Sequence, residues 1–170
     1  MGVGKVHAES AYIATEILNK AINSGMDIIY PTTGYDAEWL KSVAKEYKEK
    51  GYEVHLKLND LPTEKCVERS VLRFASEYIY TQGKTGRLVS PDYLLWMDNK
   101  PKQAFCQLIS DPEAKELFSS FDAYSNDVER NQKPEKLNID YQNAKLFHYD
   151  GIEQEQIQTN SQQQNMTRAI

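Results

Sequence analysis

A short loop of small and hydroxyl residues, Thr32-Thr33-Gly34, is the stretch of this sequence best suited to hold a ligand. It follows an apolar run over 27–30 and precedes a helical pattern that starts at Asp36. This order predicts a buried strand, a tight loop and a helix. Because ligands in open α/β sheets bind just outside the carboxyl ends of the strands, we expect a binding site at this loop. The alternative is a plain turn, which threonine and glycine also suit.

Two arginines are the next candidates for chemistry. Arg87 lies beside Gly86 in a polar loop, where a guanidinium can bind a ligand through two parallel hydrogen bonds. Arg73 lies in a helical pattern. The structural alternatives are that Arg73 pairs with Glu77 one turn later, and that Arg87 belongs to an ordinary surface loop.

The motifs of several common enzyme classes are absent from the sequence. It contains no Ser-His-Asp arrangement, G-x-S-x-G, H-E-x-x-H or Cys-x-x-Cys pattern, and His55 and His148 lack ligand spacing. A phosphate-binding loop needs G-x-x-x-x-G-K-[ST]. The run over 2–6, GVGKV, has the wrong glycine spacing and a valine where a hydroxyl must bind Mg²⁺, so we reject it. Cys66 and Cys106 fit buried free thiols rather than a metal site.

Helical and strand patterns alternate along the chain. After a loop over 1–7, we expect helices over 8–24, 36–50, from Pro62, from Ser90 with a break at Pro101, and over 111–117. We expect strands over 27–30, 52–58, 118–124 and 145–149. The order strand, helix, strand over 27–58 predicts a βαβ unit with parallel strands. In the helix after Pro62, the residues expected to face inward are Val67, Val71, Phe74, Ala75 and Tyr78.

The composition is that of a soluble globular protein. Of 170 residues, 40% are hydrophobic and 26% charged, which suits one domain with a real core. The net charge of −5 disfavours nucleic acid as a partner. We expect no membrane span, because no apolar run approaches ~20 residues, and a cytoplasmic location, because no signal peptide follows Met1. We expect a domain over 1–150 and a disordered Gln/Asn-rich tail over 151–170.

Six short motifs in one order carry a resemblance to a known family. They are VHAES at 6–10, PTTG at 31–34, KGYEVHLKLNDLP at 50–62, ERSVLR at 68–73, GRLVSP at 86–91 and FDAYSND at 121–127. Together they resemble zeta toxins, the P-loop kinases of bacterial toxin–antitoxin systems. The resemblance implies a three-layer, P-loop-kinase-like α/β fold with a parallel sheet between helices. It also implies ATP- and Mg²⁺-dependent phosphorylation of UDP-N-acetylglucosamine or a related sugar nucleotide.

The resemblance also implies roles for individual residues. Arg73 and Arg87 correspond to arginines that neutralise the transferred phosphoryl group, which makes them the catalytic candidates. The substrate-binding candidates correspond to the sugar-nucleotide loop and to a segment lining the cleft, and they are Thr33, Gly34, His7, Glu9 and Ser10. The alternative for Glu9 and Ser10 is a helix first turn, where such residues are favourable.

Departures from the family pattern bear on activity. Pro31 stands where the family commonly has an acidic residue, and Tyr35 where it often has an arginine. The Walker A loop and the catalytic aspartate are missing, so we expect an N-terminally truncated domain that alone does not bind ATP tightly and lacks kinase activity.

Binding without catalysis is the alternative function. In that case the chain is a module that holds a sugar nucleotide or an antitoxin protein. In the family, the strand carrying the P-loop lies centrally in the sheet. Its loss would open a sheet edge, so self-association is also expected.

Overall fold

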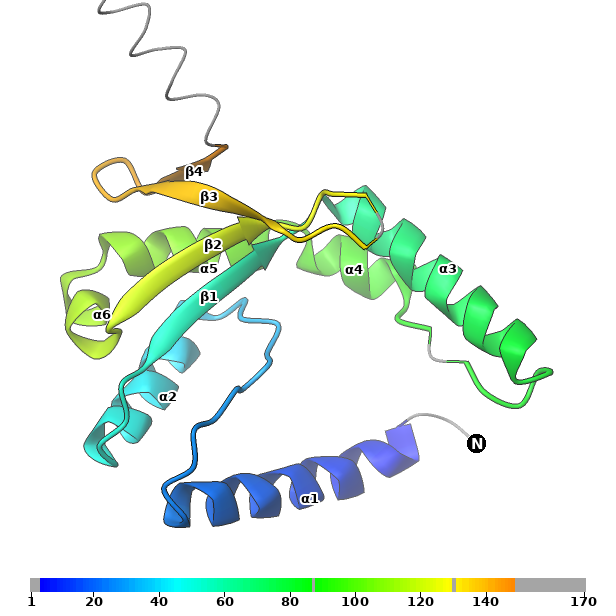
Figure 1. Ribbon diagram of the computed structural model, residues 1–170, viewed down its shortest axis with the longest axis horizontal. Coiled ribbons are helices and arrows are strands. Elements are labelled where there is room, and N and C mark those ends of the chain that lie inside the picture. The colour runs from blue at the N-terminus through cyan, green and yellow to red at the C-terminus, as the bar shows by residue number, and fades with distance from the viewer. Residues whose placement is uncertain (1–3, 87, 130, 149–170) are drawn as a thin grey trace, which may run out of the picture. The chain divides into compact units, whose positions relative to one another are not determined.

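The computed structural model describes residues 4–86, 88–129 and 131–148, with side chains from Glu9 onwards. The chain forms two compact units, Met1–Thr33 and Gly34–Ile170. Arg87 and the predicted tail over 151–170 lie outside the described residues. Figure 1 shows the helices and strands of both units.

Unit 1 consists of helix α1 (Gly4–Asn23) and the segment that follows it. The helix starts before Ala8, so the loop predicted over 1–7 is wrong from Gly4 onwards. Gly25 ends the helix as predicted, with a positive φ of 64° that glycine adopts without strain. The N–H of Met26 then bonds the carbonyl of Ala21 at 3.1 Å.

The strand predicted over 27–30 is wrong. The segment forms neither a helix nor a strand of the sheet, and Ile29 is 95% exposed. An apolar run becomes a strand only where a neighbouring strand pairs with its backbone, which a local pattern cannot guarantee. The βαβ unit predicted over 27–58 therefore does not form, and the parallel pairing lies elsewhere.

Unit 2 contains the remaining elements. Its helices are α2 (Ala37–Glu49), α3 (Thr63–Tyr80), α4 (Pro91–Met97), α5 (Lys100–Ser110) and α6 (Pro112–Leu117). Its strands are β1 (His55–Asp60), β2 (Ser120–Ser125), β3 (Glu135–Asp140) and β4 (Lys145–Phe147). The sheet order is β1-β2-β3-β4. Strands β1 and β2 are parallel, whereas β2–β3 and β3–β4 are antiparallel.

Helices flank this mixed sheet, which confirms the expected α/β fold (Figure 1). Within the described strands the parallel pairing is confined to β1 and β2, with helices α3 to α6 between them in sequence. Strand β1 lies a few residues later than predicted, and β3 was not predicted at all. The apolar residues of β3, Leu137 and Ile139, are too few to stand out from a polar stretch.

The core lies between the sheet and helices α2, α5 and α6. Leu108 and Ile109 of α5 are completely buried and belong to two adjoining apolar clusters. The first cluster joins α2, α5 and α6, and the second joins α5 to the sheet through Ala123 and Leu137. These contacts fix the helices on one face of the sheet.

Capping residues set several helix ends as the sequence predicts. Asp36 has an extended backbone, and its carboxylate accepts the N–H of Trp39 at 3.0 Å, which starts α2. Asp111 caps α6 in the same way through the N–H of Glu113 at 2.9 Å. Helix α4 starts at Pro91, and Pro101 lies in the first turn of the separate helix α5, so the predicted break is confirmed.

The inward face predicted for α3 is only partly correct. Val71 and Tyr78 are 44% and 50% exposed, whereas Ser70 is the buried position. This helix projects past the sheet (Figure 1), so little apolar surface faces its second half. Periodicity reveals the apolar face of a helix but not how much of that face is covered.

Candidate functional site

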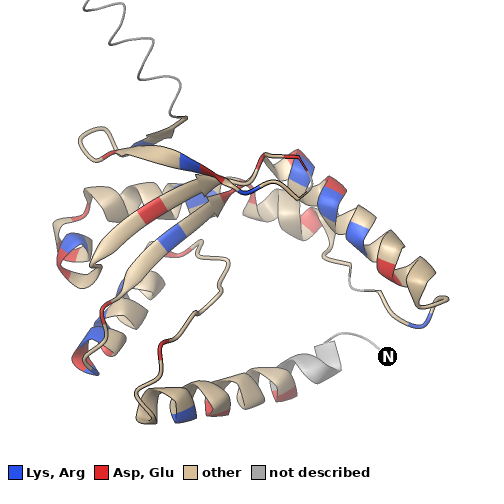
Figure 2. Ribbon diagram, viewed as in Figure 1, with Lys and Arg blue, Asp and Glu red and all other residues tan. Residues whose placement is uncertain are grey.

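The carboxyl ends of β1 and β2 meet at one edge of unit 2. Their parallel register places Asp60 beside Ser125, and the N–H of Asn126 bonds the carbonyl of Asp60 at 2.7 Å. Helix α3 begins directly after β1, and the N-terminus of α5 reaches the same edge. This is where an open α/β sheet presents a ligand site. Figure 2 shows charged residues of both signs gathered here and along α3.

Most charged groups at this edge have partners. Asp60 accepts a hydrogen bond from the Lys102 ammonium at 2.6 Å. Its position just before α3 suggests a capping role, but no described side chain caps this helix. Lys65 of α3 pairs with Asp127. The Arg69 guanidinium donates to the carbonyl of Val128 at 3.0 Å. These contacts hold the segment after β2 against α3.

Further polar contacts join α3 to the end of α4. The Thr63 hydroxyl donates to the Asp98 carboxylate at 2.7 Å, and this hydrogen bond is the main reason why the pKa of Asp98 lies below its usual value. The two cysteines are free and partly buried, as predicted, and burial raises the pKa of both thiols. The thiols are therefore weak nucleophiles.

Arg73 lies one turn beyond Arg69 on α3 and is exposed. In the part of the chain that the structure describes, no carboxylate pairs with Arg73, so the predicted alternative of an ion pair with Glu77 is not found. The guanidinium is thus available to an anionic ligand.

The loop on either side of Arg87 is fixed to the same helix. A Cβ atom on Gly86 would lie 2.8 Å from the ring of Phe74, the residue after Arg73. On the other side, the Ser70 hydroxyl donates to the carbonyl of Val89 at 3.3 Å. Only glycine allows this close approach at position 86. The neighbours of Arg87 in the chain therefore pack on α3 within one turn of Arg73.

The predicted substrate residues divide between the two units. Gly34 belongs to unit 2 and has a positive φ of 61°, with Leu40 nearby. Thr33 is exposed at the end of unit 1. Glu9 and Ser10 are exposed on α1. They lie beyond its first turn, so the alternative role as first-turn residues is wrong. His7 belongs to α1, but only its backbone is described and not its side chain.

Sequence reasoning missed two clusters in unit 2. One is an aromatic group made by Tyr35, Tyr93 and Trp96, with Lys100 against the Trp96 ring. Tyr93 and Trp96 lie three residues apart on α4, whereas Tyr35 comes from a distant segment, so sequence spacing does not predict its contact with Trp96. The second cluster is centred on Lys41.

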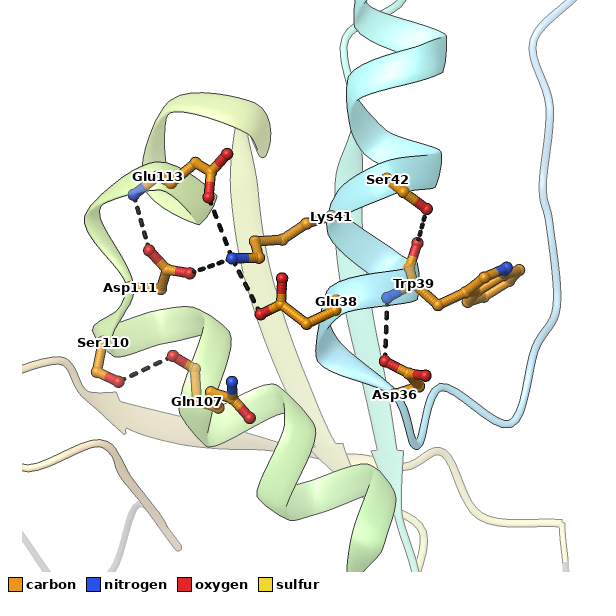
Figure 3. A network of polar contacts seen from close by, with 9 residues as sticks. All are labelled: Asp36, Glu38, Trp39, Lys41, Ser42, Gln107, Ser110, Asp111 and Glu113. Atoms are coloured by element: carbon orange, nitrogen blue, oxygen red, sulfur yellow. Dashed lines mark hydrogen bonds and ion pairs between the residues drawn. The ribbon is translucent and has the colours of Figure 1, made fainter.

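Figure 3 shows that Lys41 joins α2 to the start of α6. Its ammonium lies 3.1 Å from Glu38, 2.9 Å from Asp111 and 3.1 Å from Glu113. The hydrogen bond to Asp111 is the largest cause of the raised pKa of Lys41, and the same bond lowers the pKa of Asp111. This network positions α2 rather than forming a reactive group.

Among the described side chains, no group of three or more His, Cys, Asp or Glu residues could hold a metal ion. The described helices likewise include none that is long and apolar enough to cross a membrane.

A comparison with known families decides which family this is. The family model described as zeta toxin matches residues 3–122. The chain belongs to the zeta toxin family. This is a family of P-loop kinase-like toxins, so ATP and Mg²⁺ are the cofactors of the family in general. No curated protein and no solved structure matches the chain.

The residues present do not fit a zeta-toxin site for Mg²⁺·ATP. The candidate run over 2–6 enters helix α1 at Gly4, and Val6 cannot supply the hydroxyl that a P-loop gives to Mg²⁺. No other part of the sequence contains G-x-x-x-x-G-K-[ST].

Proposed function

We propose that this protein provides the acceptor side of a zeta-toxin-type kinase, which phosphorylates UDP-N-acetylglucosamine or a related sugar nucleotide. The observation that carries the proposal is the family match over 3–122, because it includes all seven predicted site positions. The exposed Arg73 and the anchored loop around position 87 support it.

Two sets of residues have separate tasks in this proposal. Arg73 and Arg87 neutralise the negative charge of a transferred phosphoryl group, which is a large part of catalysis in such reactions. The polar side chains of Thr33 and of His7, Glu9 and Ser10 bind the sugar nucleotide, and Gly34 lets the loop turn tightly. Because no P-loop is present in these residues, we propose that they bind the acceptor but do not transfer phosphate.

The proposal is tested by measuring acceptor binding and phosphoryl transfer separately. Calorimetry with UDP-N-acetylglucosamine should show saturable binding that Glu9→Gln and Thr33→Val each weaken about tenfold, as expected for a lost hydrogen bond to a charged or strongly polar group. Glu16→Gln is the matched control, because Glu16 is also exposed on α1. Equal binding by all variants, or no binding by the wild type, would contradict the proposal.

Phosphoryl transfer is measured with labelled ATP and the same acceptor. We expect no turnover above background. Turnover would contradict the proposal that these residues alone transfer no phosphate. Acceptor binding without turnover also fits the alternative of a non-catalytic module. Adding a separately produced P-loop segment distinguishes these two functions. The acceptor side of a kinase should then gain activity, whereas a non-catalytic module should not.

A further inference from the structure

The aromatic cluster of unit 2 has no role in the proposed phosphoryl chemistry. The ring centroids of Tyr35 and Trp96 lie 5.7 Å apart with an interplanar angle of 72°. Those of Tyr93 and Trp96 lie 5.9 Å apart at 33°. The ammonium of Lys100 lies 3.4 Å from the centre of the Trp96 ring. These are ordinary aromatic and cation–π geometries, so each ring is in contact with another ring or with a cation.

The cluster is open to solvent although its rings contact each other. Tyr35 is 45% exposed, Tyr93 42% and Trp96 53%. Rings that serve only the core are buried, whereas here about half of each side chain still faces outward. A contiguous, pre-arranged and exposed aromatic surface is a common form of binding site.

The position of the cluster connects it with the acceptor. Tyr35 follows Gly34 directly and lies in the same unit as α4 and α5. The next residue, Asp36, has its carboxylate on the N-terminus of α2. Lys100 supplies a positive charge at the cluster itself. Flat rings beside a cation suit a ligand that combines a planar ring with an anionic group.

We propose that Tyr35, Tyr93 and Trp96 form a stacking platform for the base of a nucleotide, with Lys100 near its phosphate. This inference rests on the proposed function only where it identifies the stacked base as that of the sugar nucleotide. Stacking on aromatic rings accepts every base, so the platform supplies affinity and the neighbouring loop supplies selectivity.

The two tryptophans of the chain allow a direct test, because they are Trp39 and Trp96. The ¹⁵N-labelled full chain gives two indole N–H signals, which Trp39→Phe and Trp96→Phe assign. Titration with UMP should shift the Trp96 signal and leave that of Trp39 unmoved. Tyr35→Leu and Lys100→Gln should each weaken UMP binding about tenfold, while the dispersed amide spectrum reports that the fold is kept.

Other ligands identify what stacks. A response of Trp96 to N-acetylglucosamine but not to UMP would overturn the proposal, because a sugar ring would then occupy the platform. A stronger response to AMP than to UMP would overturn the assignment to the sugar nucleotide. The absence of any shift at Trp96 up to millimolar UMP would overturn the platform altogether.

The same titrations separate this inference from the proposed function. If UDP-N-acetylglucosamine binds with dependence on Thr33 but leaves Trp96 unmoved, the platform is wrong and the proposed function stands. If UMP shifts Trp96, yet the sugar nucleotide binds no more tightly than UMP and Thr33→Val changes nothing, the platform stands and the proposed function is wrong.

Discussion

At the residue scale, the two arginines one turn apart on α3 differ in what they contact. Arg69 is part-buried and donates to the carbonyl of Val128, whereas Arg73 is exposed. An arginine whose removal breaks no internal contact can be retained for a ligand, and one that bonds the backbone serves the fold. The motif ERSVLR could not reveal which arginine serves the fold and which is free for a ligand, because both lie on the same helix.

This difference predicts opposite effects of two alanine substitutions. Arg69→Ala should lower the midpoint of thermal unfolding, because the Val128 carbonyl loses its donor. Arg73→Ala should leave the midpoint unchanged and weaken the binding of inorganic tripolyphosphate severalfold. Calorimetric scans and titrations measure both. A clear fall in the unfolding midpoint of Arg73→Ala would show instead that Arg73 is structural.

At the scale of elements, the sequence predicts an element well where its signal is local. The cap at Asp36, the turn at Gly25 and the start of α4 at Pro91 each depend on one residue and its nearest neighbours. The strand over 27–30 and the missed β3 depend on pairing with distant segments. The aromatic cluster depends on Tyr35 meeting α4, so this part of the site was also beyond prediction.

The contact between α2 and α6 is an element-scale feature that depends on pH. Lys41 lowers the pKa of Asp111, so this pair stabilises the fold above the unfolded carboxyl pKa of about 3.9. That contribution is lost as the pH falls through the lower folded value. At the alkaline end, the raised pKa of Lys41 keeps the contribution complete below about 10.4, and it is lost as the pH rises through the folded value.

Lys41→Met should therefore destabilise the protein at pH 7, and by progressively less as the pH falls below about 3.9 towards the lowered pKa of Asp111. Urea unfolding at several pH values measures the difference from the wild type. Lys45→Met is the control, because Lys45 is exposed on the same helix. A difference between wild type and Lys41→Met that stays constant with pH would show that packing of the lysine stem, and not its charge, is what matters.

At the scale of the whole molecule, the open edge of the sheet is the feature with the largest consequence. Among the described strands, β1 has a neighbour only on its β2 side. The carbonyls of Val54 and Asp60 accept hydrogen bonds from the β2 side. Because backbone groups alternate along a strand, the N–H and C=O of Lys57 point to the opposite edge. Unpaired edge groups of this kind can pair with the edge of another chain.

We therefore expect the protein to self-associate through β1 as its concentration rises. Lys57→Pro removes the outward N–H without touching the hydrogen bonds to β2, and proline is tolerated on an edge strand. This substitution should weaken association severalfold, whereas Lys57→Ala, which keeps the N–H, should not. Size-exclusion chromatography with light scattering measures the mass at each concentration, and near-ultraviolet circular dichroism checks the fold. A monomeric mass at every concentration, or equal association by both variants, would mean that the β1 edge is not the contact.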